Sequence, residues 1–116
     1  MVASDLIYRH CKPCKPGDPP LTAAQATALA GALHADWTLD ADGGVISRSC
    51  HFGNYYQTIA FVNALAWVAH AEDHHPDLEV GYNRCHIRYS THAIGGLSDN
   101  DFICAAKIDA LLPAAE

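Results

Sequence analysis

The longest apolar run of the chain, residues 55–71, has the pattern of a helix that is buried on two sides. Asn54 can cap it, with Gln57 at the third position. Pro76 disfavours helical geometry at the residue before it, so we expect the helix to end at about His74. We expect one side to pack against a sheet and the other against a second subunit, because the apolar positions exceed one narrow stripe: Ile59, Phe61, Val62, Leu65, Ala66, Val68 and Ala69.

Two further helices are predicted from their starting residues. Thr22 and Gln25 form a capping-box pattern, and the apolar positions that follow it predict a helix of three turns. Near the other end of the chain, Ser98 caps a helix whose third position is Asp101. The apolar face of this last helix consists of Cys104, Ala105, Ile108, Leu111 and Leu112.

Four strands lie between these helices. Residues 37–52 read as a hairpin that turns across Asp42-Gly43, and Arg48 falls on the apolar side of its second strand. Residues 78–82 and 84–92 form the other two strands, the second with alternating apolar positions. The order α-β-β-α-β-β-α predicts an α+β fold: a four-stranded antiparallel sheet with three helices packed on one face. We expect residues 1–20 to be a flexible N-terminal arm and residues 21–116 to be a single domain.

Composition narrows the function. The 116 residues suffice for one modest core, and the net charge of −6 with scattered basic residues argues against direct nucleic-acid binding. The N-terminus has no apolar stretch typical of a signal peptide, and the longest apolar run is shorter than the ~20 residues of a bilayer span, so no membrane partner is expected. Five cysteines, an odd number, indicate reduced thiols. We therefore expect a cytoplasmic protein, or a nuclear one if the source is eukaryotic.

The motif "CKPC" at Cys11 and Cys14 requires separate consideration. A thioredoxin-like motif needs its second cysteine inside a helix, and the three prolines at 16, 19 and 20 forbid a helix there. A structural zinc site would need a second ligand pair, and the chain has no second CxxC. The pattern favours a flexible arm without a catalytic role, with metal or redox use as the alternatives.

Residues 70–101 hold five of the eight histidines and therefore form the candidate site. His70 and His74 are four apart near a helix end, His75 follows at once, His92 ends a strand, and Asp101 stands in the first turn of the last helix. These side chains can meet at one edge of the sheet. The residues alone leave three interpretations open: a metal site, because HxxxH is a ligand spacing, acid–base catalysis, or structural hydrogen bonding.

Several motifs together resemble the pterin-4a-carbinolamine dehydratase family. They are "HHPD" at 74–77, then Tyr82, "TH" at 91–92, "GGLSDND" at 95–101 and "AAKID" at 105–109. The family pattern consists of a titratable residue, His-His-Pro, an aromatic residue, His and Asp. The spacings between these positions in this chain agree with the pattern. The resemblance extends over nearly the whole chain, including "PPLT" before the first helix. One departure is His70, which stands where the family commonly has Glu.

The resemblance implies a hydro-lyase that converts 4a-hydroxytetrahydrobiopterin to quinonoid dihydropterin and water by histidine acid–base catalysis. Such an enzyme supports the recycling of tetrahydrobiopterin for aromatic amino acid hydroxylases, and it needs no metal and no other cofactor. It also implies a homodimer or homotetramer. The alternative role is that of a dimerisation cofactor for a homeodomain transcription factor, without essential catalysis. The implied catalytic residues are His74, His75, His92 and Asp101, and the implied substrate-binding residues are His70, Pro76, Tyr82 and Thr91.

Overall fold

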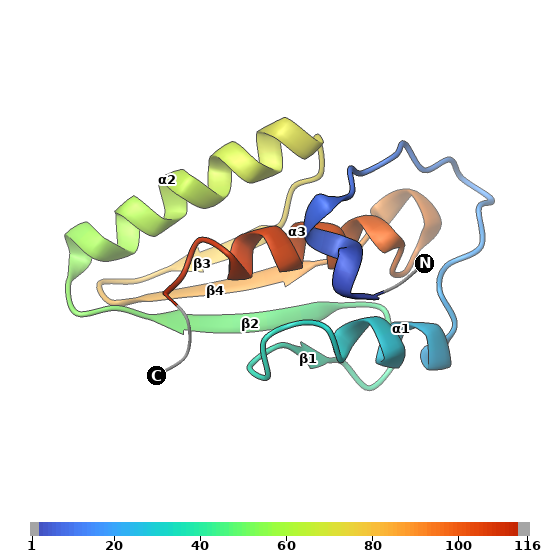
Figure 1. Ribbon diagram of the computed structural model, residues 1–116, viewed down its shortest axis with the longest axis horizontal. Coiled ribbons are helices and arrows are strands. Elements are labelled where there is room, and N and C mark those ends of the chain that lie inside the picture. Colours follow the sequence, from blue (N-terminus) through green and yellow to red (C-terminus); the bar gives the residue numbers. More distant parts are fainter. Residues whose placement is uncertain (1–2, 114–116) are drawn as a thin grey trace.

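The computed structural model describes residues 3–113 and contains one four-stranded antiparallel sheet with the strand order β1-β2-β4-β3 (Figure 1). This confirms the predicted α+β fold and the order of its main elements, to which two short 3₁₀ helices are added. The elements in chain order are η1 (Ala3–Tyr8), α1 (Ala23–Ala30), β1 (Thr38–Leu39), β2 (Ile46–His51), α2 (Tyr55–Glu72), β3 (Asp77–Val80), β4 (Arg84–Tyr89), η2 (His92–Ile94) and α3 (Asp99–Asp109).

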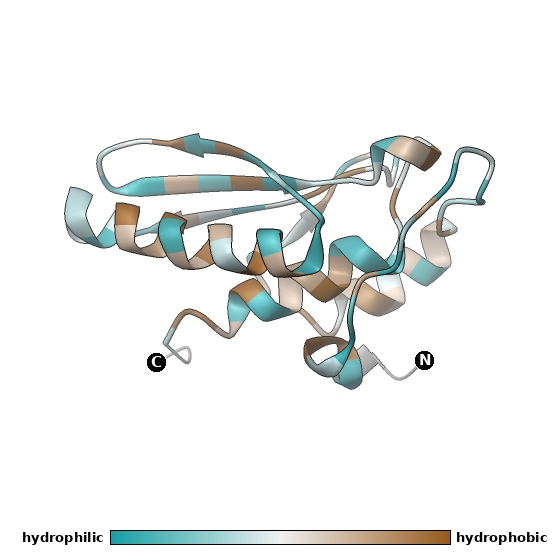
Figure 2. Ribbon diagram, turned by 90° about the horizontal axis from the view of Figure 1, so that it is seen from above, coloured by the Kyte–Doolittle hydropathy of each residue, from teal (hydrophilic) through white to brown (hydrophobic). Residues whose placement is uncertain are grey.

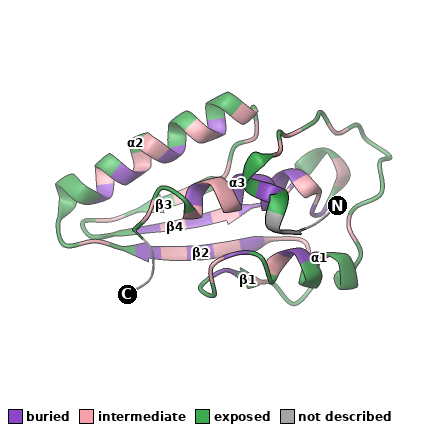
Figure 3. Cartoon of the chain, viewed as in Figure 1, coloured by how far each residue is buried: buried purple, intermediate pink, exposed green. Residues whose placement is uncertain are grey.

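The two central strands, β2 and β4, alternate between a buried and a solvent-facing side. Ile46 lies opposite Tyr89 and Cys50 opposite Cys85, and all four side chains are buried. The side chains that point to the other side of the sheet are more exposed, as the period of two in a strand requires (Figure 3): Ser47, Ser49, His86 and Arg88. Figure 2 shows the consequence: the sheet is one layer, and the helices lie together on one side of it.

The helices begin where the sequence predicts. Thr22 and Gln25 form a complete capping box, and the Asn54 side chain accepts a hydrogen bond from the backbone of Gln57. α1 differs from the prediction in length, since it has 8 residues instead of three turns. It ends at Gly31, because glycine is a poor helix former, and Leu33 reaches the core from the turn that follows.

The segment expected to be a flexible arm makes defined contacts. Leu6 of η1 is buried in the core, and the Lys107 ammonium of α3 donates a hydrogen bond to the carbonyl oxygen of Ile7 at 3.0 Å. These contacts place η1 against α3, although whether residues 1–20 are flexible stays a prediction. Within residues 3–113, no helix combines the length and the apolar character that crossing a bilayer would require.

Arg48 lies on the apolar side of β2, as the sequence predicts, and its charge is paired there with a carboxylate. The Arg48 guanidinium lies 2.6 Å from Oδ1 of Asp109, which also accepts a hydrogen bond from the Trp37 indole at 2.7 Å. The other oxygen of Asp109 accepts from the backbone of His34. One carboxylate at the end of α3 therefore ties β2 to the loop that follows α1.

We expect Asp109→Ala to lower the free energy of unfolding by roughly 3–5 kcal/mol, because it leaves the buried Arg48 charge without a partner. Urea denaturation followed by circular dichroism measures this change. Asp42→Ala, at the exposed turn of the β1–β2 hairpin, is the matched control and should change stability little. Equal effects of the two substitutions would contradict the importance of the Arg48–Asp109 pair.

Candidate active site

The end of α2 determines where the first two histidines lie. The helix stops at Glu72, and Asp73 adopts the left-handed conformation (φ 50°, ψ 44°), which Asp tolerates better than most residues. The backbone N–H of His74 then bonds to the carbonyl oxygen of Ala69 at 3.1 Å. His74 and His75 therefore leave the helix axis and turn toward the end of β4.

Three of the predicted histidines line one cavity of about 390 Å³. Its walls come from the link between α2 and β3, from the link between β4 and η2, and from a part of the N-terminal segment. The first link supplies His74 and His75, and the second supplies Thr91 and His92. The complete lining is Cys11, Lys12, Pro13, Cys14, Glu72, Asp73, His74, His75, Ser90, Thr91, His92, Ala93 and Asn100.

Asp101 lies beneath this cavity and binds His74. Its Oδ1 accepts a hydrogen bond from Nε2 of His74 at 2.6 Å, and its side chain is fully buried. Its Oδ2 accepts from the Thr91 hydroxyl at 2.8 Å and from the Ser98 backbone at 3.0 Å. Asp101 thus completes the capping box of α3 and at the same time orients an imidazole. The helix-capping position predicted for Asp101 is therefore combined with a hydrogen bond to His74.

The environment of His74 favours its protonated form. Burial alone would lower the pKa of the imidazole, but the hydrogen bond and the negative charge of Asp101 outweigh burial and raise the pKa above its usual value of 6.5. The ring also stacks on Tyr89, with 5.2 Å between the ring centroids. An imidazole that is held in place and whose pKa is raised is suited to donate a proton as a general acid.

His75 and His92 are more exposed than His74 and lie at the rim of the same cavity. His92 opens η2, which ends at Gly95 in the left-handed conformation (φ 68°). This turn brings the chain back so that the backbone N–H of Thr91 bonds to the carbonyl oxygen of Gly96 at 2.8 Å. The glycine turn therefore fixes the short path from His92 to the start of α3.

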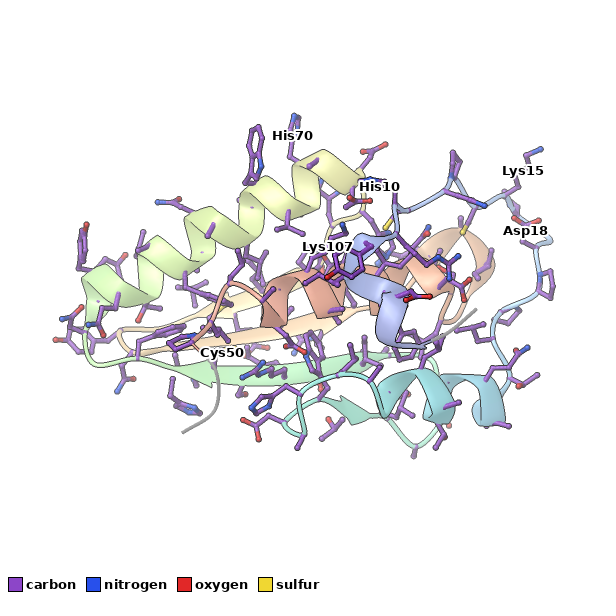
Figure 4. All side chains as sticks on the ribbon, in the orientation of Figure 1. His10, Lys15, Asp18, Cys50, His70 and Lys107 are labelled. Carbon is purple, nitrogen blue, oxygen red and sulfur yellow. The ribbon has the colours of Figure 1, made fainter. Side chains whose placement is uncertain are left out.

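Three of the predicted substrate-binding residues do not line the cavity: His70, Pro76 and Tyr82. His70 points outward from α2 (Figure 4), and its ring centroid lies 6.4 Å from that of Trp67. Because the helix ends before His74, His70 and His74 do not share a helix face. Tyr82 is 65% exposed in the turn between β3 and β4, at the end of β4 opposite to Thr91. With 6 residues in β4, the two ends of that strand lie ~20 Å apart. Pro76 follows His75 at the start of β3 and is half-buried.

The fourth predicted substrate-binding residue, Thr91, lines the cavity and is buried, with its hydroxyl bound to Asp101. The metal alternative was based on His70 and His74 at the HxxxH spacing, and His70 is not part of the cavity. Among residues 3–113, no group of three His, Cys, Asp or Glu side chains has a geometry that could hold a metal ion.

Sequence reasoning missed two residues that connect the cavity to the N-terminal segment, Glu72 and Asn100. Burial raises the pKa of Glu72, but a hydrogen bond from the Cys11 backbone, His10 and the charge of Lys107 together bring that pKa below its usual value. Figure 4 shows His10, in the link that follows η1, and Lys107, on α3, near the end of α2. Because Cys11 and Glu72 are 61 residues apart, no local pattern could have revealed this contact.

The fold and the cavity define a small α+β protein in which three histidines line one cavity. Comparison with known proteins is more specific: residues 19–111 match the family model described as pterin 4 alpha carbinolamine dehydratase. The chain belongs to the pterin-4a-carbinolamine dehydratase family, which confirms the resemblance seen in the sequence.

Individual relatives agree with this assignment. A protein of Nitrosomonas eutropha named for pterin-4-alpha-carbinolamine dehydratase is 62% identical over 93% of this chain and 94% of its own length. A protein of Legionella pneumophila with the same name is 50% identical over 96% of this chain and 98% of its own. A solved structure from Brucella melitensis, titled transcriptional coactivator/pterin dehydratase, superposes with a TM-score of 0.75 at 28% identity and covers 79% of this chain and 97% of its own.

We expect Asp101→Asn to lower the pKa of His74, because the substitution removes the negative charge that raises it. The raised pKa means that the His74–Asp101 pair stabilises the fold fully below about pH 6.5 and loses this contribution as the pH rises through the raised value. The stability difference between the wild type and Asp101→Asn should therefore shrink as the pH rises from 6.5 through the raised pKa of His74. NMR titration of the histidines and urea denaturation at several pH values measure both effects.

Asp99→Asn is the matched control, since Asp99 lies in the same first turn of α3 but is partly exposed and pairs with Arg9 at 3.6 Å. This control should leave the titration of His74 unchanged. A pKa of His74 that is the same in Asp101→Asn and in the wild type would show that the carboxylate does not set the proton affinity of the imidazole.

Proposed function

We propose that this protein dehydrates 4a-hydroxytetrahydrobiopterin, a pterin 4a-carbinolamine, to quinonoid dihydropterin and water. The observation that carries the proposal is the convergence of His74, His75 and His92 on one cavity, with His74 bound to a buried carboxylate. Membership of the dehydratase family supports the same reaction. The cavity volume, about 390 Å³, lies within the range of ≈ 300–1,000 Å³ that is usual for sites of small molecules.

The reaction requires one proton donor and one proton acceptor. The lone pair of N5 expels the hydroxyl group from C4a, and this oxygen must be protonated as it leaves as water. The proton on N5 passes to a base. Imidazole exchanges protons near neutral pH, and each well-placed proton transfer accelerates a reaction by roughly 10²–10⁴-fold. No hydride moves, so the histidines can supply the chemistry without a redox cofactor.

The surroundings of each histidine suggest its role. His74 has a raised pKa and would protonate the C4a hydroxyl, while His92 would accept the N5 proton. The two could exchange these roles between substrate stereoisomers. His75 would orient the pterin ring by hydrogen bonding. Asp101 would act as a positioning residue that holds His74, in the manner of carboxylates that orient an imidazole in other enzymes.

We expect His74→Ala and His92→Ala each to reduce turnover more than about tenfold, because each removes one proton-transfer group. The assay is the ultraviolet-monitored decay of chemically generated 4a-carbinolamine with and without the protein. His51→Ala is the control, since His51 is exposed at the end of β2 that pairs with Arg84, far from the cavity. Unchanged rates in both cavity variants would refute the assignment of these histidines.

A homodimer or homotetramer is also proposed. The outer face of α2, defined by Tyr56, Ala60, Asn63 and Trp67, is solvent-facing in the single chain. Tyr56 is 81% and Trp67 70% exposed, which is unusual for large aromatic side chains unless a partner covers them. A second copy of the chain, packed helix on helix, would bury this face.

The alternative role, a binding module for a transcription factor, would use the same face instead of the cavity. The Brucella structure is titled both a coactivator and a dehydratase. A second solved structure is titled a pterin dehydratase-like protein identified as a RuBisCO assembly factor. It superposes with a TM-score of 0.59 at 28% identity and covers 67% of this chain and 90% of its own. A pull-down with homeodomain proteins beside the dehydration assay on one sample separates the two roles. An aromatic amino acid hydroxylase, as the source of the carbinolamine, is the other proposed partner.

We expect light scattering to report a dimer or tetramer for the wild type and a smaller assembly for Trp67→Lys, because a buried ammonium would destabilise the interface. Tyr8→Lys is the control, since Tyr8 is an aromatic residue of similar exposure (82%) on η1 and is not one of the residues that define the outer face of α2. A monomeric wild type would contradict the proposed assembly.

A cytoplasmic location is proposed as well. All five cysteines are free thiols, as expected in a reducing compartment. The Sγ atoms of Cys11 and Cys104 lie 3.6 Å apart without a bond between them, which fits that environment.

A further inference from the structure

The motif Cys11–Cys14, here called the wall segment, is held against the cavity by two largely buried side chains. The backbone N–H of Cys11 bonds to Oε1 of Glu72 at 2.7 Å. Asn100 contacts both polar backbone groups of Lys12: its Oδ1 accepts from the N–H at 3.0 Å, and its Nδ2 donates to the carbonyl oxygen at 2.6 Å. The exposed fractions are 6% for the Glu72 side chain and 8% for Asn100.

This double contact by Asn100 resembles the pairing between strands, because one side chain satisfies an N–H and a C=O of the same residue. It fixes the position of the wall segment although the segment has no helix or strand of its own. The thiols add to the contact. Sγ of Cys11 lies 3.6 Å from the carbonyl oxygen of Asn100, and Sγ of Cys14 lies 3.6 Å from Nδ2 of the same residue.

The wall segment and the three histidines line the same cavity. Cys11, Lys12, Pro13 and Cys14 are four of the thirteen lining residues, so the cavity would lose nearly a third of its lining without them. Proline and cysteine offer an apolar ring and a polarisable sulfur, which make favourable contacts with flat ring systems. The match to the family model begins at residue 19, so this wall comes from outside the matched region.

We propose that the wall segment is a substrate-positioning element that contacts the bound pterin through Pro13 and Cys14. The inference rests on the proposed function, since it assigns a further part of the same site. It gives the CKPC motif a role that needs neither metal nor redox chemistry: the segment closes one side of the cavity and holds the ring near His74 and His92.

The first test uses the thiol of Cys14 as a reporter in the full-length, reduced protein. Iodoacetamide should alkylate Cys14, and saturating 7,8-dihydrobiopterin should slow that alkylation about tenfold, because the bound ring covers the sulfur. Mass spectrometry of the peptides measures the rate. Tyr8→Cys supplies an exposed thiol outside the cavity whose alkylation the pterin should leave unchanged.

The second test separates positioning from chemistry. Cys14→Tyr places a bulky side chain in the cavity and should raise KM about tenfold with a smaller effect on kcat, because it obstructs binding and leaves the histidines in place. Lys15→Tyr is the matched control on the next residue, whose side chain extends away from the protein (Figure 4) and does not line the cavity. It should leave KM unchanged.

The outcomes distinguish this inference from the proposed function. Protection of Cys14 together with a raised KM in Cys14→Tyr supports the wall segment as part of the site. If isothermal titration shows that 7,8-dihydrobiopterin binds, yet Cys14 is alkylated at the same rate and Cys14→Tyr retains its KM, the inference is overturned and the dehydratase proposal stands. If the wild type neither binds the pterin nor dehydrates the carbinolamine, the proposed function fails and this inference fails with it.

Discussion

The buried carboxylate of Asp101 is the interaction on which both the fold and the site depend. A charge without solvent is costly unless donors surround it, and here an imidazole, a hydroxyl and a backbone N–H supply them. These donors come from the end of α2, the end of β4 and the start of α3. Satisfying one carboxylate therefore brings three separate parts of the chain together at the cavity.

The two carboxylates at the ends of α3 perform comparable tasks. Asp101 at its start gathers the elements around the cavity, and Asp109 at its end gathers Arg48, Trp37 and the backbone of His34. The apolar residues between them pack into the core. Polar contacts therefore fix α3 at both ends, and burial fixes it along its length. Such a rigid helix can support a site whose other residues lie in links and turns.

Local signals predicted most of the fold. The capping boxes at Thr22 and Ser98, the turn at Asp42-Gly43 and the alternation along β4 each depend on residues only a few positions apart. The pattern also identified Arg48 as the exception on the buried side of β2. The convergence of His74, His75 and His92 followed from their places at the ends of elements, where side chains from different segments can meet.

What the sequence did not reveal depends on single backbone angles and on distant contacts. Pro76 placed the end of α2 at about His74, but the left-handed Asp73 ends the helix at Glu72, so His70 and His74 do not share a helix face. A proline shows only where a helix can no longer continue, so it cannot show that the helix ends a few residues earlier. Asn100 fixes the position of the CKPC motif, although Asn100 is 88 residues away from Lys12. The prolines exclude a helix in this segment, but they do not prevent it from packing against the rest of the protein.

The double role of Asp101 affects how the enzymatic activity of related proteins can be inferred from their sequences. A relative that lost dehydratase activity and only bound other proteins would still need Asp101 to cap α3. The fold would not require the exposed imidazole of His92. Retention of the acid is then a poor guide to enzymatic competence. Under the proposed mechanism, loss of His92 with Asp101 retained would mark a relative that no longer catalyses dehydration.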